Sequence, residues 1–207
     1  MRNRYQVQFE LRMNSATSTH NYEYLDILDR AWAESGLTRP CGGVVCDMGC
    51  ASFSYAAALQ AFFGPRELVG VEVEGHRLFR DGYARIDHAS GYVAEIPNAR
   101  FVVADYVTYE LPADVITAWF PFVTPAAILA WRLPLSLLMP ERIFARICHN
   151  LRPAGVFLMV NHGIQEADIA DDLCTAAGLR RSFRFAEPGV LSIHRRRAAV
   201  VSGWTRT

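Results

Sequence analysis

The residues best suited to chemistry lie in one short stretch near the end of the chain's first quarter. An apolar run that begins at Val44 ends in Asp47, and Gly49 and Ala51 follow before an alanine-rich segment, residues 55–63, that is typical of a helix. A strand, a tight turn of small residues and a helix form the usual cofactor-binding corner of an open α/β sheet. The turn lets a ligand approach the backbone, and the start of the helix offers unpaired N–H groups. The stretch therefore predicts a cofactor site.

The acid in this stretch indicates which kind of cofactor suits it. A turn that binds NAD has the pattern G-x-G-x-x-G and carries its acid at the end of the next strand, whereas here only Gly49 remains and Asp47 ends the first strand. A carboxylate there would crowd a pyrophosphate but would suit a cationic ligand. S-adenosylmethionine carries an ammonium and a sulfonium and no phosphate, so the electrostatics favour it. An NAD-type oxidoreductase would rest on the fold alone.

The rest of the sequence predicts the frame that would position this site. Strand-like and helix-like runs alternate after a short strand or arm at 4–12 and a polar loop at 14–20. The predicted strands are 44–47, 68–73, 100–104, 114–118, 156–161, 181–186 and 198–204, and the predicted helices are 22–33, 55–63, 76–88, 141–151 and 164–177. Strand–helix units followed by an antiparallel hairpin, whose connection begins at Pro188, imply an α/β fold. We expect a mostly parallel, seven-stranded sheet with helices on both faces.

In this frame the sequence resembles the class I S-adenosylmethionine-dependent methyltransferases at five points, in the order of that family. The points are the glycine-rich first motif, usually written D-x-G-x-G-x-G, at 47–53; the second strand at 69–73; the end of the third strand at 102–106; the fourth strand at 114–118; and the L-x-P-G-G turn at 151–156. The likeness runs from about residue 42 to 161, and the tail fits the family's closing antiparallel pair. It implies a Rossmann-like methyltransferase domain at 41–207, preceded by an arm and helix, 1–40, that cap the cofactor site.

The resemblance also implies roles for single residues. Asp47, Gly49 and Ala51 would form the turn around the cofactor, and Glu72 would bind both ribose hydroxyls. Asp105 would take the adenine amino group. The remaining cofactor-lining candidates, which lie beside these acids or at the end of the fourth strand, are Val73, Tyr106 and Ala118. Each acid also has a structural alternative, as a turn cap, a surface strand end or a helix cap.

One departure from the family pattern bears on the activity. Phe53 replaces the last glycine of the first motif, where the helix begins near the methionine part of the cofactor. Its ring either points into the core or narrows the pocket. The second case would make the chain a non-catalytic methyltransferase-fold protein that acts as a binding or interaction module.

The substrate side of the predicted site is aromatic. Trp119, Phe120 and Phe122 follow the fourth strand and could form a wall over the sulfonium or around an apolar acceptor, or could equally be core. Trp119 and His162 are the catalytic candidates, because His162 lies just past the fifth strand at the ligand edge and could act as a general base. Tyr24 lies in the N-terminal segment that often covers the cofactor in this family. The apolar insert at about 119–140 is either a substrate lid or a homodimer face.

Composition limits the classes of function. The 207 residues are 51% apolar and 20% charged, with 21 basic and 21 acidic residues, so no global field attracts nucleic acid or an anionic membrane. Every basic residue is arginine, which excludes a Schiff base or a lysine base. The arginines at 195–197, with Arg180, Arg181 and Arg184, favour a solvated face over a phosphate site.

Cysteine and hydropathy patterns indicate where the protein works. Five cysteines with no C-x-x-C pair and no zinc spacing predict a reduced, cytoplasmic protein without a metal site. The charged N-terminus does not resemble a signal peptide, and prolines interrupt the apolar run 115–139, which argues against a membrane span. We expect transfer of a methyl group from S-adenosylmethionine to an unidentified, small-molecule acceptor, with S-adenosylhomocysteine as the product.

Overall fold

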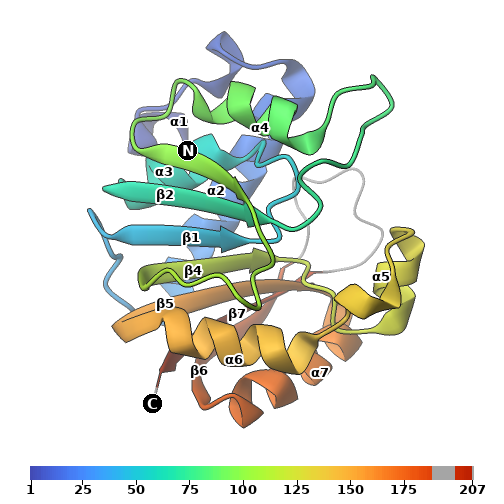
Figure 1. The fold of residues 1–207 in the computed structure, drawn as a ribbon. Coiled ribbons are helices and arrows are strands. Elements are labelled where there is room, and N and C mark those ends of the chain that lie inside the picture. Colours follow the sequence, from blue (N-terminus) through green and yellow to red (C-terminus); the bar gives the residue numbers. More distant parts are fainter. Residues whose placement is uncertain (188–198, 207) are drawn as a thin grey trace. The chain divides into compact units, whose positions relative to one another are not determined.

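The computed structural model describes residues 1–187 and 199–206 (Figure 1). Its contacts divide the chain into two compact units, residues 1–105 and 106–207, and each is described by itself. The predicted connection at Pro188 and the arginines at 195–197 lie outside the described residues. The predicted domain boundary at residue 40 stays a prediction.

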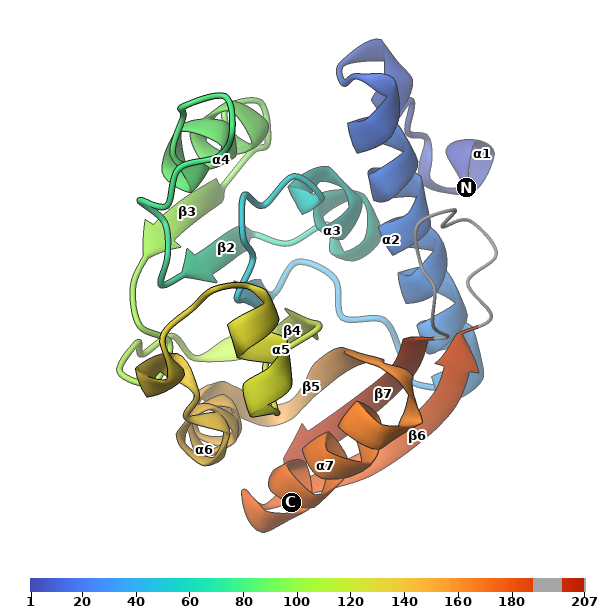
Figure 2. The same cartoon turned by 90° about the vertical axis from the view of Figure 1, so that its right-hand side faces the viewer.

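The first unit holds three parallel strands and the helices of the N-terminal half. Its elements are α1 (Arg2–Tyr5), η1 (Phe9–Leu11), α2 (Ser15–Ser35), β1 (Val44–Met48), α3 (Ala56–Phe63), β2 (Glu67–Glu72), α4 (Arg85–Val93) and β3 (Ala99–Val103). The strands lie in the order β3-β2-β1, and Asp47 of β1 is in register with Gly70 of β2. Helix α3 lies between α2 and α4 (Figure 2). Every residue of β1 is buried, as expected for a strand covered on both faces.

The N-terminal segment differs from its prediction. Residues 4–12 form parts of α1 and η1 and no strand. The polar loop expected at 14–20 is wrong, because these residues are the cap and first turns of α2. The Asn14 side chain accepts the N–H of Thr17 at 2.9 Å, and Ser18 Oγ donates to the Asn14 carbonyl at 2.7 Å. Polar side chains that bond to the backbone of their own helix allow a segment without apolar periodicity to be helical.

The helix expected at 76–88 is also wrong over most of its length. Residues 73–84 form turns, closed by a bridge between Leu78 and Ala84, and α4 begins only at Arg85. Gly82 has φ 86°, a left-handed conformation that interrupts any helix there. Asp87 then starts α4 by accepting the backbone N–H of Ala84 at 2.8 Å.

The second unit holds two parallel strands followed by an antiparallel pair. Its elements are β4 (Ala113–Trp119), α5 (Pro125–Ala130), η2 (Leu135–Leu137), α6 (Pro140–Asn150), β5 (Leu151–His162), α7 (Gly163–Ala176), β6 (Leu179–Glu187) and β7 (Ala199–Arg206). Their order is β4-β5-β7-β6, with β4 parallel to β5 and with β7 antiparallel to both of its neighbours. Helices α6 and α7 contact each other and both pack on β5 (Figure 1).

The fold class is confirmed. Across the described residues the chain has seven strands of a mostly parallel α/β sheet, with the expected antiparallel pair at the C-terminus and helices around it. The apolar insert is divided into the short helices α5 and η2. No helix in the described part of the chain is both long enough and apolar enough to cross a membrane.

Candidate cofactor site

The turn after β1 has the backbone of a glycine-rich motif, although it contains only one glycine. Gly49, Ala51 and Phe53 all have positive φ, at 70°, 50° and 54°. These are the three glycine positions of the pattern D-x-G-x-G-x-G. Left-handed backbone costs a residue with a Cβ about 1 kcal/mol or more relative to glycine. The surrounding structure therefore imposes this conformation on Ala51 and Phe53.

The Phe53 ring lies in the core. Its side chain is fully buried, and it makes an edge contact with Tyr55 at 5.9 Å between ring centroids. The ring fills the space above Gly70, where an added Cβ would lie 2.6 Å from Phe53 Cδ1 and 2.9 Å from Cys50 Sγ. Beside Gly49, by contrast, an added Cβ would meet nothing within 4 Å. Phe53 thus packs on β2, and the turn keeps open space on the side of Gly49.

Asp47 is bound to a tyrosine at the start of α3. The Tyr55 hydroxyl donates to Asp47 Oδ2 at 2.6 Å, and both residues are buried. Burial raises the pKa of the Tyr55 hydroxyl well above its usual value, and the Asp47 carboxylate raises it further. Tyr55 therefore stays protonated and remains a donor at every physiological pH. Tyr24 of α2 stacks on the Tyr55 ring at 4.1 Å, so this predicted substrate-lining residue lies beside the first motif.

Glu72, at the end of β2, has three partners in its own unit. Its Oε2 accepts the N–H of Ala51 at 2.8 Å, and its Oε1 accepts the N–H of Glu74 at 2.9 Å. Nη1 of Arg85 forms an ion pair with Oε1 at 2.9 Å. The Glu72 and Arg85 side chains are only 7% and 6% exposed. The bond from Ala51 explains why a left-handed turn persists without glycine, because it joins the turn directly to β2.

The end of β3 lies at the same edge as Glu72. The Ala104 N–H donates to the Glu72 carbonyl at 3.1 Å, and Asp105 follows as a half-buried residue. Val73 is 42% exposed next to Glu72. The first unit therefore brings Asp47, Glu72 and Asp105 to the carboxyl edge of its three parallel strands, where ligands of open α/β sheets bind.

Helix α2 supports the start of α3 through one buried amide. Asn21 Oδ1 accepts the N–H of Ala58 at 3.0 Å, and its Nδ2 donates to the Ser54 carbonyl at 2.8 Å. Tyr55, at the N-cap position of α3, provides no side-chain cap of its own. Asn21 therefore satisfies a helix-terminal N–H group from another helix.

In the second unit, the ends of the adjacent strands β4 and β5 carry the predicted substrate residues. Phe120 and His162 stack face to face, with centroids 4.0 Å apart and ring planes 13° apart. The Phe120 N–H donates to the Val160 carbonyl at 2.7 Å, and Phe120 has φ 59°. Trp119, 7% exposed, is buried. Of the two catalytic candidates, only His162 is exposed.

The other predicted site residues of the second unit differ in burial. Tyr106 and Ala118 are buried. Phe122 is half-buried, and its ring centroid lies 6.0 Å from that of the exposed Trp131 of the insert. Two described arginines of the cluster form ion pairs: Arg181 contacts Asp171, and Arg184 contacts Asp168 at 2.6 Å and Asp171 at 2.7 Å.

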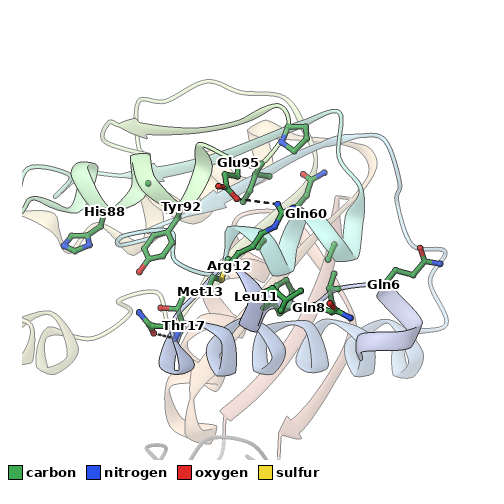
Figure 3. A pocket seen from close by; sticks show the side chains of 18 of the residues that line it. Gln6, Gln8, Leu11, Arg12, Met13, Thr17, Gln60, His88, Tyr92 and Glu95 are labelled. Atoms are coloured by element: carbon green, nitrogen blue, oxygen red, sulfur yellow. Dashed lines mark hydrogen bonds and ion pairs between the residues drawn. The ribbon is translucent and has the colours of Figure 1, made fainter.

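A separate groove lies on the helical side of the first unit. It has a volume of about 860 Å³ and is lined by the N-terminal segment, α3 and α4. Arg12 and Glu95 form an ion pair of 3.5 Å across it (Figure 3). None of the predicted site residues lines this groove.

Sequence reasoning missed Tyr55, Arg85 and Asn21, the partners of the predicted site residues. Tyr55 follows Asp47 by eight residues and Arg85 follows Glu72 by thirteen, but the members of each pair belong to different elements, so no periodic pattern relates them. Gly70 did carry a signal, because a glycine inside an apolar strand indicates close approach of another group. That group is the ring of Phe53.

Comparisons with known proteins identify the fold. No protein-family model and no curated protein sequence matches the chain. Among solved structures, an S-adenosylmethionine-dependent methyltransferase from Clostridium acetobutylicum is similar with a TM-score of 0.61 at 8% identity, covering 99% of this chain and 96% of that one. The N-methyltransferase NodS from Bradyrhizobium japonicum gives 0.61 at 12% identity, covering 91% and 96%.

A third similar structure holds a bound nucleoside. Geranyl diphosphate C-methyltransferase from Streptomyces coelicolor, in complex with Mg²⁺, geranyl diphosphate and S-adenosylhomocysteine, gives a TM-score of 0.62 at 10% identity, covering 90% of this chain and 79% of that one. Together with the strand order within each unit, these likenesses show that the chain has the fold of the class I methyltransferases.

Proposed function

We propose that the protein binds S-adenosylmethionine at the carboxyl edge of β1, β2 and β3 and transfers its methyl group to an acceptor. The observation that carries the proposal is the turn after β1. It keeps left-handed backbone at all three glycine positions of the family motif although two of them are not glycine. Strained backbone of this kind clusters at ligand sites. Two of the similar structures named above support the choice of cofactor, since one is S-adenosylmethionine-dependent and the other holds S-adenosylhomocysteine.

The described residues suit such a ligand chemically. Asp47 supplies a buried negative charge beside the turn, and Tyr55 fixes the carboxylate in place. Glu72 Oε2 accepts one N–H and keeps capacity for a ribose hydroxyl. Asp105 and Val73 would contact the adenine. Tyr106 and Ala118 keep their predicted cofactor roles as part of this proposal.

When bound, S-adenosylmethionine would supply an electrophilic methyl group and a neutral sulfide as leaving group. The chain would need only to align the acceptor and to remove a proton from it. His162 is exposed, and its ring stacks on Phe120, a position that suits a general base.

We propose a small, partly apolar acceptor. The exposed Leu129, Trp131 and Leu135 of the insert support an apolar contact surface, which would suit a homodimer face as well as a substrate lid. Zero net charge argues against nucleic acid. The five cysteines, all within the described residues, are free thiols, which favours the cytoplasm. Two of the similar structures named above are a C-methyltransferase and an N-methyltransferase, so the fold does not select the acceptor atom.

A second candidate is a non-catalytic member of the fold that binds a partner. It is favoured by one observation, that Asp47 and Glu72 both have partners within the chain, in Tyr55 and Arg85. Phe53, which motivated this alternative in the sequence, no longer supports it, because its ring is buried against Gly70.

Isothermal titration calorimetry with S-adenosylhomocysteine separates the two candidates. We expect the wild-type protein to bind S-adenosylhomocysteine and not NADH. Glu72→Ala should weaken binding by about 1–3 kcal/mol, roughly 5-fold to 150-fold, because a hydrogen bond to a charged group is lost.

Glu67→Ala is the matched control for this experiment. Glu67 lies at the other end of β2 and forms an ion pair with Arg100 at 2.9 Å, which is exposed where the pair of Glu72 with Arg85 is buried. This variant should bind like the wild type. No detectable binding by the wild type at millimolar ligand would remove the methyltransferase proposal and leave the binding module.

A further inference from the structure

Asp47 acts on a ligand at the turn through its charge. The residue is fully buried, so a ligand there lies near the charge without touching the carboxylate. Burial raises the pKa of the Cys50 thiol, and the charge of Asp47 raises it further, which shows that the field of Asp47 extends into the turn. Beside Gly49 the turn keeps open space, since an added Cβ meets nothing within 4 Å. A cationic group bound in this space is attracted by Asp47.

Tyr55 holds this charge in place. Its hydroxyl donates to Asp47 Oδ2 at 2.6 Å, which is the length of a charge-assisted O–H···O⁻ bond. A hydrogen bond to the charged form of a carboxylate favours that form. Both residues are buried, so bulk water does not compete for the carboxylate. Without the hydroxyl, Asp47 would lose a donor in surroundings where an unpaired charge is costly.

Helix α2 fixes Tyr55 through two side chains that are three residues apart. Asn21 donates to the Ser54 carbonyl at 2.8 Å and accepts the N–H of Ala58 at 3.0 Å. It therefore binds the backbone on both sides of Tyr55. Tyr24 stacks on the Tyr55 ring, with centroids 4.1 Å apart and ring planes 14° apart. Since residues three apart share one face of a helix, a single face of α2 holds both the backbone and the ring of Tyr55.

We propose that Tyr55 is a positioning residue for the amino-acid end of the cofactor, which acts through Asp47 and is supported by Tyr24. The Tyr55–Asp47 pair attracts the ammonium group of this end and does not act on the nucleoside. The site thus prefers an adenosine thioether that carries an ammonium group over one that lacks it. This inference rests on the proposed function, in which the cofactor binds beside the turn.

Calorimetry with two matched ligands separates this role from a general effect on the fold. The ligands are S-adenosylhomocysteine and its analogue in which hydrogen replaces the amino group. Tyr55→Phe removes only the hydroxyl. We expect this variant to bind S-adenosylhomocysteine about 10-fold more weakly than the wild type and the analogue within about 2-fold, because a hydrogen bond to a charged group is lost. The ratio of the two affinities should therefore fall.

Tyr5→Phe is the matched control. It removes another tyrosine–aspartate hydrogen bond of the first unit, from Tyr5 Oη to Asp29 Oδ1 at 2.5 Å. This variant should bind both ligands like the wild type. Equal weakening of both ligands by Tyr55→Phe would overturn the inference, because the hydroxyl would then support the fold and not the ammonium subsite. Tighter binding of S-adenosylhomocysteine would overturn it as well, because the hydroxyl would then reduce the attraction by Asp47.

Variants of Tyr24 cover the case in which Tyr55→Phe does not fold. Tyr24 is half-buried, so a substitution there disturbs the core less. Tyr24→Leu removes the stacked ring and should lower the affinity ratio of the two ligands by about 3-fold, whereas Tyr24→Phe keeps the ring and should match the wild type. If Tyr55→Phe does not fold, an unchanged ratio in Tyr24→Leu overturns the inference.

The same titrations distinguish the inference from the proposed function. If the wild type binds neither ligand at millimolar concentration, the proposed function and the role of Tyr55 both fail. If the wild type binds S-adenosylhomocysteine and Tyr55→Phe keeps the wild-type ratio of affinities, only the role of Tyr55 fails.

Discussion

At the scale of single residues, Phe53 and Gly70 form one packing unit. The sequence of the first motif shows a phenylalanine where the family has glycine, and the second strand shows a glycine where a strand interior prefers a larger residue. The two are complementary in space, since the Phe53 ring occupies the volume that a side chain at Gly70 would need. The replacement of glycine by phenylalanine at position 53 therefore leaves the turn open, because the ring packs in the core against Gly70.

Gly70→Ala should destabilise the protein by about 1–3 kcal/mol, which is the usual cost of overpacking a dense core. The new Cβ would lie 2.6 Å from Phe53 Cδ1 and 2.9 Å from Cys50 Sγ. Urea unfolding followed by circular dichroism measures the change. The control is Gly91→Ala in α4, where an added Cβ meets nothing within 4 Å and which should stabilise the protein by about 0.5–1 kcal/mol. Equal effects at the two glycines would contradict the packing described for Phe53.

At the scale of elements, the strands agree with their predictions better than the helix starts do. Strands β1 to β4 begin and end within one residue of their predictions because short β-branched, apolar runs have few other stable arrangements. Strand β5 ends near its predicted residue but begins at Leu151, five residues before the predicted start. The starts of α2 and α4 depend instead on single capping side chains, Asn14 and Asp87. Such caps resemble ordinary loop residues in the sequence.

Asn14→Ala should therefore cost about 1 kcal/mol of stability, because the N–H of Thr17 loses its acceptor. Chemical denaturation gives the free energy of unfolding. Asn14→Ser, which retains a capping oxygen, should be close to the wild type. If alanine and serine were equally harmless at this position, the cap would not be what starts α2.

At the scale of the whole molecule, the absence of lysine changes how the protein responds to alkali. Arginine keeps its charge at every accessible pH, so above pH 9 tyrosine and cysteine are the side chains that titrate. Burial and the hydrogen bond to Asp29 raise the pKa of Tyr5 to about 12. Tyr5 Oη donates to Asp29 Oδ1 at 2.5 Å, and this bond joins α1 to α2.

The contribution of the Tyr5 hydroxyl to stability decreases as the pH rises, because its pKa differs between the folded and the unfolded protein. The folded pKa of Tyr5 lies above its unfolded value of about 10, so the folded state holds the proton more tightly. The stability from Tyr5 is fully present below pH 10 and is lost as the pH rises towards 12. Tyr5→Phe should thus show a smaller fall in melting temperature between pH 9 and pH 11 than the wild type. Tyr83→Phe is the control, because Tyr83 is 62% exposed. Its melting temperature should fall between pH 9 and pH 11 as much as that of the wild type. Identical profiles for Tyr5→Phe and the wild type would contradict this account.

The sequence by itself determined the fold class, the order of the strands along the chain and the turn after β1. These features depend on local patterns: apolar runs of strand length, small residues at turns and acids at strand ends. Asp47, Glu72 and Asp105 were predicted to lie at one edge because the carboxyl ends of parallel strands meet there, and the first unit brings them to its edge. Their functional roles stay proposals.

Only the tertiary structure decided what those acids contact. Tyr55 binds Asp47, Arg85 pairs with Glu72, and the Asn21 side chain bonds to the backbone at the start of α3. Each of these contacts joins residues that no periodic pattern relates. It also decided the direction of the Phe53 ring, which depends on the absence of a side chain at Gly70. Hydrophobic periodicity is a property of one element, whereas a hydrogen bond between elements depends on how their surfaces pack, and packing is fixed only when the whole unit is assembled.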